Sequence, residues 1–131
     1  MPTDQLVTNY QNGVSAPKFE KVLRILLDEI REELPETKII LMEPFVFCGS
    51  STEYSWEFIS SEVRKRAEAV CRIAGEMEIP CVLLQNEFEK AYKMAPQTYY
   101  IRDGVHPNII GHGLIAREWK SVFSAVQSEW K

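Results

Sequence analysis

Two short apolar segments, each preceded by a long amphipathic pattern, restrict the fold more than any other feature of the chain. Residues 38–43 (KIILME) lie between Pro35 and Pro44, and residues 79–84 (IPCVLL) repeat the same character further along. Short, almost continuously apolar runs are typical of strands that are covered on both faces of a parallel sheet. We therefore expect two buried parallel strands.

The first amphipathic pattern predicts a helix from about Ala16 to Leu34. Ser15 is placed to cap this helix, Pro17 falls in its first turn, and Pro35 ends it. Apolar side chains recur every three or four residues along it, which predicts one inward-facing stripe. The expected stripe is Phe19, Val22, Leu23, Leu26, Ile30 and Leu34.

Three further helices are expected beyond the first apolar segment. Residues 45–55 read as a loop that ends in Ser55, the predicted cap of a second long helix. A shorter helix is expected over residues 87–94, and Asn108 is the predicted cap of a last helix that runs to about Ser128. The inner stripe of the second long helix is expected to be Ile59, Val63, Ala67, Val70, Ile73 or Ala74, and Met77.

Strands that alternate with helices imply right-handed crossovers and a parallel sheet. The predicted class is therefore α/β, a three-layer α/β/α arrangement reduced to about two strands and four helices. Residues 1–131 are expected to form a single domain in which residues 1–14 are irregular. Two strands leave a strand edge and some helix faces uncovered, so either strands are missing from this chain or another copy supplies the cover.

Composition excludes several classes of function. The chain has a formal net charge of −4 at pH 7, and its basic residues are interleaved with acidic ones, so neither nucleic acid nor a membrane surface is an expected partner. No apolar run is long enough to span a membrane, and the N-terminus lacks the pattern of a secretory signal. Cys48, Cys71 and Cys81 form no CxxC pair, which predicts reduced, mostly buried thiols in a cytoplasmic protein without a structural metal or cofactor.

The loop before the last helix places Asp103 three residues ahead of His106. In a catalytic triad the imidazole takes a proton from the nucleophile, while a carboxylate on its other nitrogen fixes the tautomer and stabilises the imidazolium. Gly104 eases the tight turn that this spacing needs, and Pro107 and Asn108 end the loop. The spacing alone is also compatible with a structural, hydrogen-bonded histidine.

The wider phrase DGVHPNIIGHGLIAREW resembles the C-terminal block of the SGNH, or GDSL-type, lipase and acylhydrolase family. The segment EKVLRILLDEIREELPETKIILMEPFVF is similar to a helix and the fourth strand of that family, with Glu-Pro after the strand. The resemblance implies a flavodoxin-like, five-stranded parallel sandwich in which residues 38–43 and 79–84 are the fourth and fifth strands. It also implies hydrolysis of acyl esters of carbohydrates or lipids, with Asp103 as the acid and His106 as the base.

The sequence departs from this family at the nucleophile and at the oxyanion hole. Neither a G-D-S motif nor a G-x-N-D motif occurs, and Asn9 and Asn12 are not assigned as oxyanion donors. Ser50 and Ser51 follow a strand, yet they lack the G-x-S-x-G elbow, so a polar turn is the preferred interpretation. We therefore expect the chain alone to be a poor catalyst.

Other candidate residues are interpreted as structural. His112 is expected to pack or form hydrogen bonds, because a lone histidine makes no metal site. Glu43 ends a strand where sites of α/β proteins gather, but a role in the loop beside Pro44 is at least as plausible. Tyr54, Trp56, Phe58, Tyr99 and Tyr100 are aromatic candidates for a pocket or for packing under the loops.

Two functional hypotheses follow. The first is a serine-dependent ester hydrolase that acts on a small-molecule ester, for which this chain supplies Asp103 and His106 and needs no cofactor. The second is a non-catalytic α/β module that self-associates through an exposed sheet edge. Both predict a homo-oligomer or a missing N-terminal half.

Overall fold

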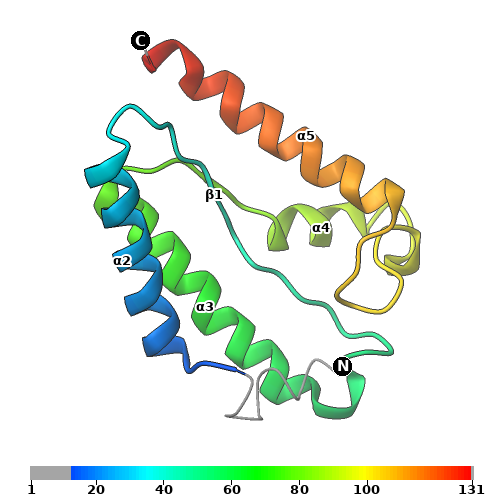
Figure 1. Ribbon diagram of the computed structural model, residues 1–131. Helices are drawn as coiled ribbons and strands as arrows, with labels where there is room; N and C mark the ends of the chain where they lie inside the picture. The colour runs from blue at the N-terminus through cyan, green and yellow to red at the C-terminus, as the bar shows by residue number, and fades with distance from the viewer. Residues whose placement is uncertain (1–12, 131) are drawn as a thin grey trace.

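The computed structural model describes residues 13–130 and has an α/β architecture. Strands β1 (Leu41–Met42) and β2 (Cys81–Val82) pair in parallel, with Leu41 opposite Cys81 and Met42 opposite Val82. The helices are α2 (Ala16–Glu33), α3 (Trp56–Met77), α4 (Gln85–Ala91) and α5 (Ile109–Val126). Figure 1 shows α2 and α3 together on one side of the strands and α5 on the other. The predicted three-layer class with two strands and four helices is thus confirmed over the described residues.

The predicted helix caps are correct at two of the three positions. The Ser15 side chain accepts a hydrogen bond from the Lys18 backbone N–H, and the Asn108 side chain accepts from the N–H groups of Ile110 and Gly111. Ser55 precedes α3 as expected, but its side chain makes no capping hydrogen bond. The reason is local: a turn of 3₁₀ helix (Glu53–Ser55) leads directly into α3, so Ser55 lacks the extended backbone of a capping residue.

Both strands are much shorter than the predicted segments 38–43 and 79–84. Pro80 has no N–H to donate, although its carbonyl still accepts from the Leu41 N–H at 2.9 Å. At the other end the ladder stops because the N–H groups of Leu84 and Gln85 donate to the Glu43 carboxylate. The same contacts start α4 at Gln85, so the helix predicted over 87–94 begins and ends earlier than expected.

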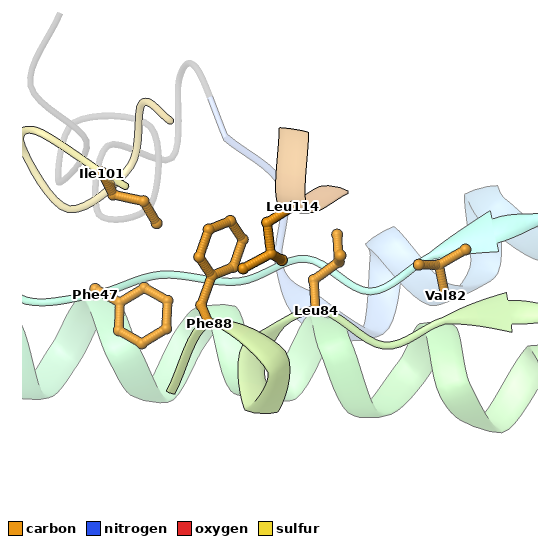
Figure 2. Close-up of a cluster of buried hydrophobic side chains, with 6 residues drawn as sticks. All are labelled: Phe47, Val82, Leu84, Phe88, Ile101 and Leu114. Carbon is orange, nitrogen blue, oxygen red and sulfur yellow. The ribbon is translucent and has the colours of Figure 1, made fainter. Parts of the chain in front are cut away.

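Two apolar clusters lie on opposite faces of the strands. Leu27, Ile73 and Ile79 form the cluster beneath α2 and α3. The larger cluster packs between the strand ends, α4 and α5, where Phe88 is fully buried, and Figure 2 shows its six members. They are Phe47, Val82, Leu84, Phe88, Ile101 and Leu114. This larger cluster supports the loop that carries Asp103 and His106, since Ile101 belongs to it.

The expectation that both strands are covered on both faces is only partly correct. Met42 is 42% exposed and Leu83 is 53% exposed. Within the described part of the chain α5 packs mainly on β2, which leaves Met42 without full cover. The stripe predicted for α2 is also rotated: Leu27 is its buried residue, whereas Val22 and Leu26 are exposed.

Across residues 13–130, none of the helices combines the length and apolar character needed to cross a membrane.

Candidate active site

The loop between α4 and α5 is closed by backbone contacts that bring its two ends together. Ile101 and Pro107 form an isolated antiparallel bridge, and the Asn108 N–H donates to the Tyr100 carbonyl at 2.9 Å. At the tip, Gly104 has φ +99°, a conformation that side-chain-bearing residues rarely adopt. A Cβ on Gly104 would also lie 2.3 Å from the Phe47 carbonyl oxygen, so glycine is required here for two reasons.

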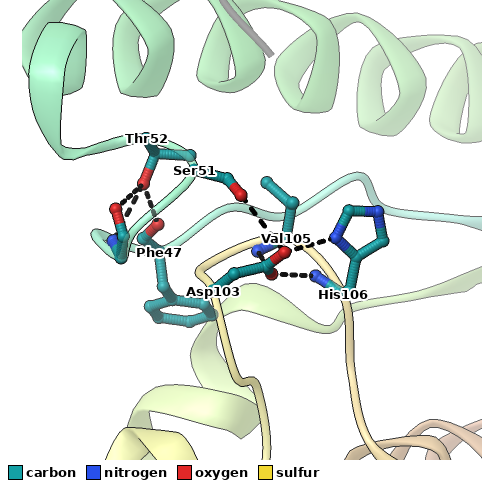
Figure 3. A network of polar contacts seen from close by, with 7 residues as sticks. Phe47, Ser51, Thr52, Asp103, Val105 and His106 are labelled. Atoms are coloured by element: carbon teal, nitrogen blue, oxygen red, sulfur yellow. Dashed lines mark hydrogen bonds and ion pairs between the residues drawn. The ribbon is translucent and has the colours of Figure 1, made fainter. Parts of the chain in front are cut away.

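Asp103 and His106 meet on this loop. His106 Nδ1 lies 2.6 Å from Asp103 Oδ2, while the N–H groups of Val105 and His106 donate to Asp103 Oδ1 at 3.1 and 2.8 Å. The Ser51 hydroxyl donates to Asp103 Oδ2 at 3.2 Å, as Figure 3 shows. The carboxylate therefore accepts four hydrogen bonds, two on each oxygen, which uses its acceptor positions fully.

These hydrogen bonds keep Asp103 ionised. Burial raises the pKa of its carboxyl, but the donors from His106, Val105 and Ser51 outweigh burial and hold that pKa well below its usual range. An ionised acceptor at Nδ1 favours the proton on Nδ1 and leaves Nε2 with its lone pair. The arrangement thus selects the imidazole tautomer that a general base needs.

The two side chains differ sharply in exposure. The Asp103 side chain is 14% exposed, whereas the His106 side chain is 75% exposed. In Figure 3 the His106 ring points away from the loop, with one nitrogen turned toward Asp103. Chemically, the pair can accept a proton at Nε2 from a group that approaches from outside the described residues.

The turn after β1 packs against the backbone of the Asp103 loop. The Phe47 N–H donates to the Gly104 carbonyl at 2.9 Å, and the Ser51 N–H donates to the Asp103 carbonyl at 3.1 Å. A Cβ on Gly49 would lie 2.4 Å from the Asp103 carbonyl group, so the two backbones touch. Buried Thr52 closes this turn, because its hydroxyl donates to the Phe47 carbonyl at 2.7 Å and accepts from the Gly49 N–H at 2.9 Å.

Glu43 and Gln85 continue the sheet where its main-chain ladder stops. Glu43 Oε1 accepts from the N–H groups of Leu84 and Gln85 at 2.9 and 2.8 Å. The Gln85 amide accepts from the Val46 N–H at 3.1 Å and donates to the Val46 carbonyl at 3.2 Å. Glu43 thus has the structural role that its place beside Pro44 allowed. Gln85 was missed, because a polar residue after a strand carries no sequence signal for such pairing.

The serines beside Gly49 do not occupy the position of a nucleophile. Ser51 lies against the acid rather than at the exposed nitrogen of His106, and Ser50 is exposed. Asn9 and Asn12 lie outside the described residues. Between residues 13 and 130, therefore, the structure brings together Asp103 and His106, the predicted acid and base, and no hydroxyl hydrogen bonds to His106.

A cleft of about 380 Å³ lies between α3, the segment after β1 and the start of α4. Of the aromatic candidates after β1, Trp56 lines it, whereas Tyr54 and Phe58 are not among its lining residues and are about half exposed. Neither Asp103 nor His106 borders the cleft. It is therefore separate from the Asp103–His106 pair.

The remaining candidates have structural or exposed positions. Tyr100 packs against the larger apolar cluster. The Tyr99 ring contacts the Tyr100 ring edge-on, with their centroids 5.2 Å apart. His112 is exposed on α5, which disfavours packing, and the alternative expectation of a hydrogen-bonding role stays a prediction. It lies on the opposite side of the helix from buried Leu114. Cys48 is exposed, contrary to expectation, because it belongs to the surface turn after β1.

The described residues contain no group of three or more side chains suited to hold a metal ion.

Comparisons with solved structures find a similar fold in esterases. No protein-family model matches the sequence, and no significant match is found among curated proteins. A solved structure described as a GDSL-like lipase, from Parabacteroides merdae, is 28% identical with a TM-score of 0.81 over 94% of this chain and 56% of its own. The acetylxylan esterase Axe2 from Geobacillus stearothermophilus is 25% identical with a TM-score of 0.73 over 90% of this chain and 52% of its own.

A third structure extends the likeness in fold alone. The esterase domain of the ORF1 protein from the zebrafish ZfL2-1 retrotransposon is 19% identical, with a TM-score of 0.65 over 90% of this chain and 64% of its own. The chain spans about half the length of the first two structures. These structures confirm the resemblance seen in the sequence: the fold of this chain is similar to about half of a GDSL-like lipase and of an acetylxylan esterase.

Proposed function

We propose that this chain supplies the acid and the base of a serine-dependent ester hydrolase. The observation that carries the proposal is the 2.6 Å contact between Asp103 Oδ2 and His106 Nδ1, made by a mostly buried carboxylate to an exposed imidazole. The likeness to a GDSL-like lipase and to an acetylxylan esterase supports the same reaction class.

In the proposed reaction, Nε2 of His106 takes the proton of a serine hydroxyl as its oxygen attacks the ester carbonyl. Asp103 stabilises the imidazolium that results, through the hydrogen bond at Nδ1. The imidazolium then gives its proton to the departing alcohol, which leaves an acyl-enzyme, and a water activated by the same nitrogen releases the acid. The substrate class is an acyl ester, with acetyl esters of carbohydrates supported by the likeness to Axe2.

The serine and the oxyanion donors belong, in this proposal, to segments outside the 131 residues. Neither G-D-S nor G-x-N-D occurs in the sequence, and no hydroxyl between residues 13 and 130 hydrogen bonds to His106. Without these groups the covalent and electrostatic contributions to acyl transfer are lost. The chain alone should therefore hydrolyse esters poorly.

The test compares hydrolysis of p-nitrophenyl acetate by this chain and by a version that carries G-D-S and G-x-N-D segments N-terminal to it. We expect turnover only in the extended version, with loss on His106→Ala and no loss on His112→Ala, the matched exposed histidine. Equal His106-dependent turnover in both versions would show that the nucleophile lies within this chain. A non-catalytic assembly module predicts instead that His106→Ala leaves hydrolysis unchanged in both.

Self-association stays a prediction. Val22 and Leu26 on α2, together with Met42 on β1, are exposed apolar side chains that another copy or further strands would cover. Sedimentation at micromolar concentration tests it, and a well-folded monomer would contradict it.

A further inference from the structure

The turn formed by Cys48, Gly49, Ser50, Ser51 and Thr52 has a role that the proposed reaction does not yet use. Its serines suggest a nucleophile, yet the structure packs this turn against the backbone of Asp103. The Ser51 side chain reaches the carboxylate itself, at 3.2 Å from Oδ2. The turn therefore contacts both the backbone and the carboxylate of Asp103.

Ser51 differs from the other donors to Asp103 in where it comes from. Three of the four hydrogen bonds to the carboxylate originate in the loop itself, from Val105 and His106. The fourth comes from Ser51, which is 52 residues away in the sequence and is the one donor outside that loop in the described part of the chain. Ser51 thus ties the carboxylate to the turn after β1.

We propose that Ser51 is a positioning residue that acts through Asp103, by fixing the rotation of the carboxylate so that Oδ2 faces His106 Nδ1. Oδ1 is held by two backbone N–H groups, and Oδ2 is shared between the Ser51 hydroxyl and the imidazole. A carboxylate oxygen has two acceptor positions, so a donor in one directs the other toward the ring. The inference rests on the proposed function, because it concerns the same acid and base pair.

Removal of the Ser51 hydroxyl should leave the surrounding structure in place, because the other contacts of the turn do not use it. The Ser51 N–H still donates to the Asp103 carbonyl, and the Phe47 N–H still donates to the Gly104 carbonyl. Thr52 holds the turn through its own hydroxyl. Ser51→Ala therefore isolates the contact with the carboxylate, Ser51→Thr restores a hydroxyl, and Ser50→Ala is a matched control on an exposed neighbour.

The measurement is the tautomer ratio of each histidine ring, read from the ¹⁵N chemical shifts of Nδ1 and Nε2 at a pH where the rings are neutral. The chain has two histidines, so His112 serves as an internal reference that makes no contact with Asp103. We expect the Nδ1–H to Nε2–H ratio of His106 to fall about threefold or more in Ser51→Ala, since the net contribution of a typical hydrogen bond shifts an equilibrium by about twofold to tenfold. Ser51→Thr should restore most of the ratio, and Ser50→Ala should leave it unchanged.

Asp103→Asn separates the two proposals. It should abolish the preference of His106 for Nδ1–H. If it does so while Ser51→Ala leaves the ratio unchanged, the positioning role of Ser51 is wrong and the acid and base pair stands. If Asp103→Asn itself leaves the His106 ratio unchanged, the pair on which the proposed function rests is wrong. A fall in Ser51→Ala that Ser51→Thr does not reverse would also count against the positioning role, since it would point to a packing effect.

Discussion

Asp103→Asn should lower the free energy of unfolding at neutral pH, and this loss should be smaller at acidic pH. The Asp103 side chain is 14% exposed and accepts four hydrogen bonds. An asparagine keeps one oxygen for the N–H groups of Val105 and His106. Its amide nitrogen, however, would face the Ser51 hydroxyl and the His106 ring, where an acceptor is needed.

The magnitude follows from the contacts that change. A hydrogen bond to a charged group contributes about 1.5–3 kcal/mol, but His106 is largely exposed and can exchange its bond for one with water. The Ser51 hydroxyl can rotate and accept from the new amide. We therefore expect a loss of about 2 kcal/mol in the free energy of unfolding at pH 7.

The pH dependence has a definite sign. The pKa of Asp103 is lowered in the folded chain, while an unfolded aspartate titrates near about 3.9. The stabilisation from ionised Asp103 is thus complete above that unfolded value and is lost as the pH falls toward the folded one. The difference in stability between wild type and Asp103→Asn should shrink steadily below about pH 4.

Urea unfolding followed by tryptophan fluorescence at pH 7, 5 and 3.5 measures this difference. Asn108→Ala is a suitable control, because it removes a helix cap on the same loop, costs about 1 kcal/mol and adds no titrating group. A difference between wild type and Asp103→Asn that stays constant from pH 7 to 3.5 would refute the reasoning, as would equal stability at pH 7.

Three further predictions concern close packing and burial. Gly49→Ala should lower the free energy of unfolding by about 1–3 kcal/mol, because the added Cβ would overlap the backbone of the Asp103 loop. Gly75→Ala in α3 meets nothing within 4 Å and should raise it by about 0.5–1 kcal/mol. Thermal unfolding of the two variants measures the difference. Phe88→Ala should cost about 3–5 kcal/mol by emptying the larger apolar cluster, as denaturant titration would show. Cys81 should react with iodoacetamide far more slowly than exposed Cys48, because burial raises the pKa of the Cys81 thiol to about 12, and peptide mapping after brief labelling distinguishes them.

The parts of the fold that depend on local pattern were predictable from sequence. The period of apolar residues located α2 and α3, and the side chains of Ser15 and Asn108 marked two helix starts. The lengths of the two strands were overestimated, because apolar character indicates burial and not strand pairing. Ile39 and Ile40 pack against the apolar clusters but do not take part in the β-ladder. The rotation of the α2 stripe from Leu26 to Leu27 depends on how α2 packs on α3, which periodicity alone does not define.

In the candidate site, too, local contacts were predictable from the sequence and contacts between distant segments were not. Asp103 and His106 lie on one turn, so their meeting follows from three residues of spacing and one glycine. The contacts with Ser51 and Gly49 join segments about fifty residues apart, and they depend on the path of the chain after β1. Spacing cannot report such contacts.

The replacement of main-chain pairing by Glu43 and Gln85 has a consequence for transplanting this site. Main-chain pairing ends after two residue pairs, and beyond it the Gln85 amide holds the other segment by bonding to the N–H and carbonyl of Val46. This path places Phe47 beside Gly104 and the turn of residues 48–52 beside Asp103. A graft of only the DGVHP loop onto another parallel sheet would transfer Asp103 and His106 without the contacts that orient the carboxylate. The smallest portable unit is the loop together with residues 43–52 and the first turn of α4.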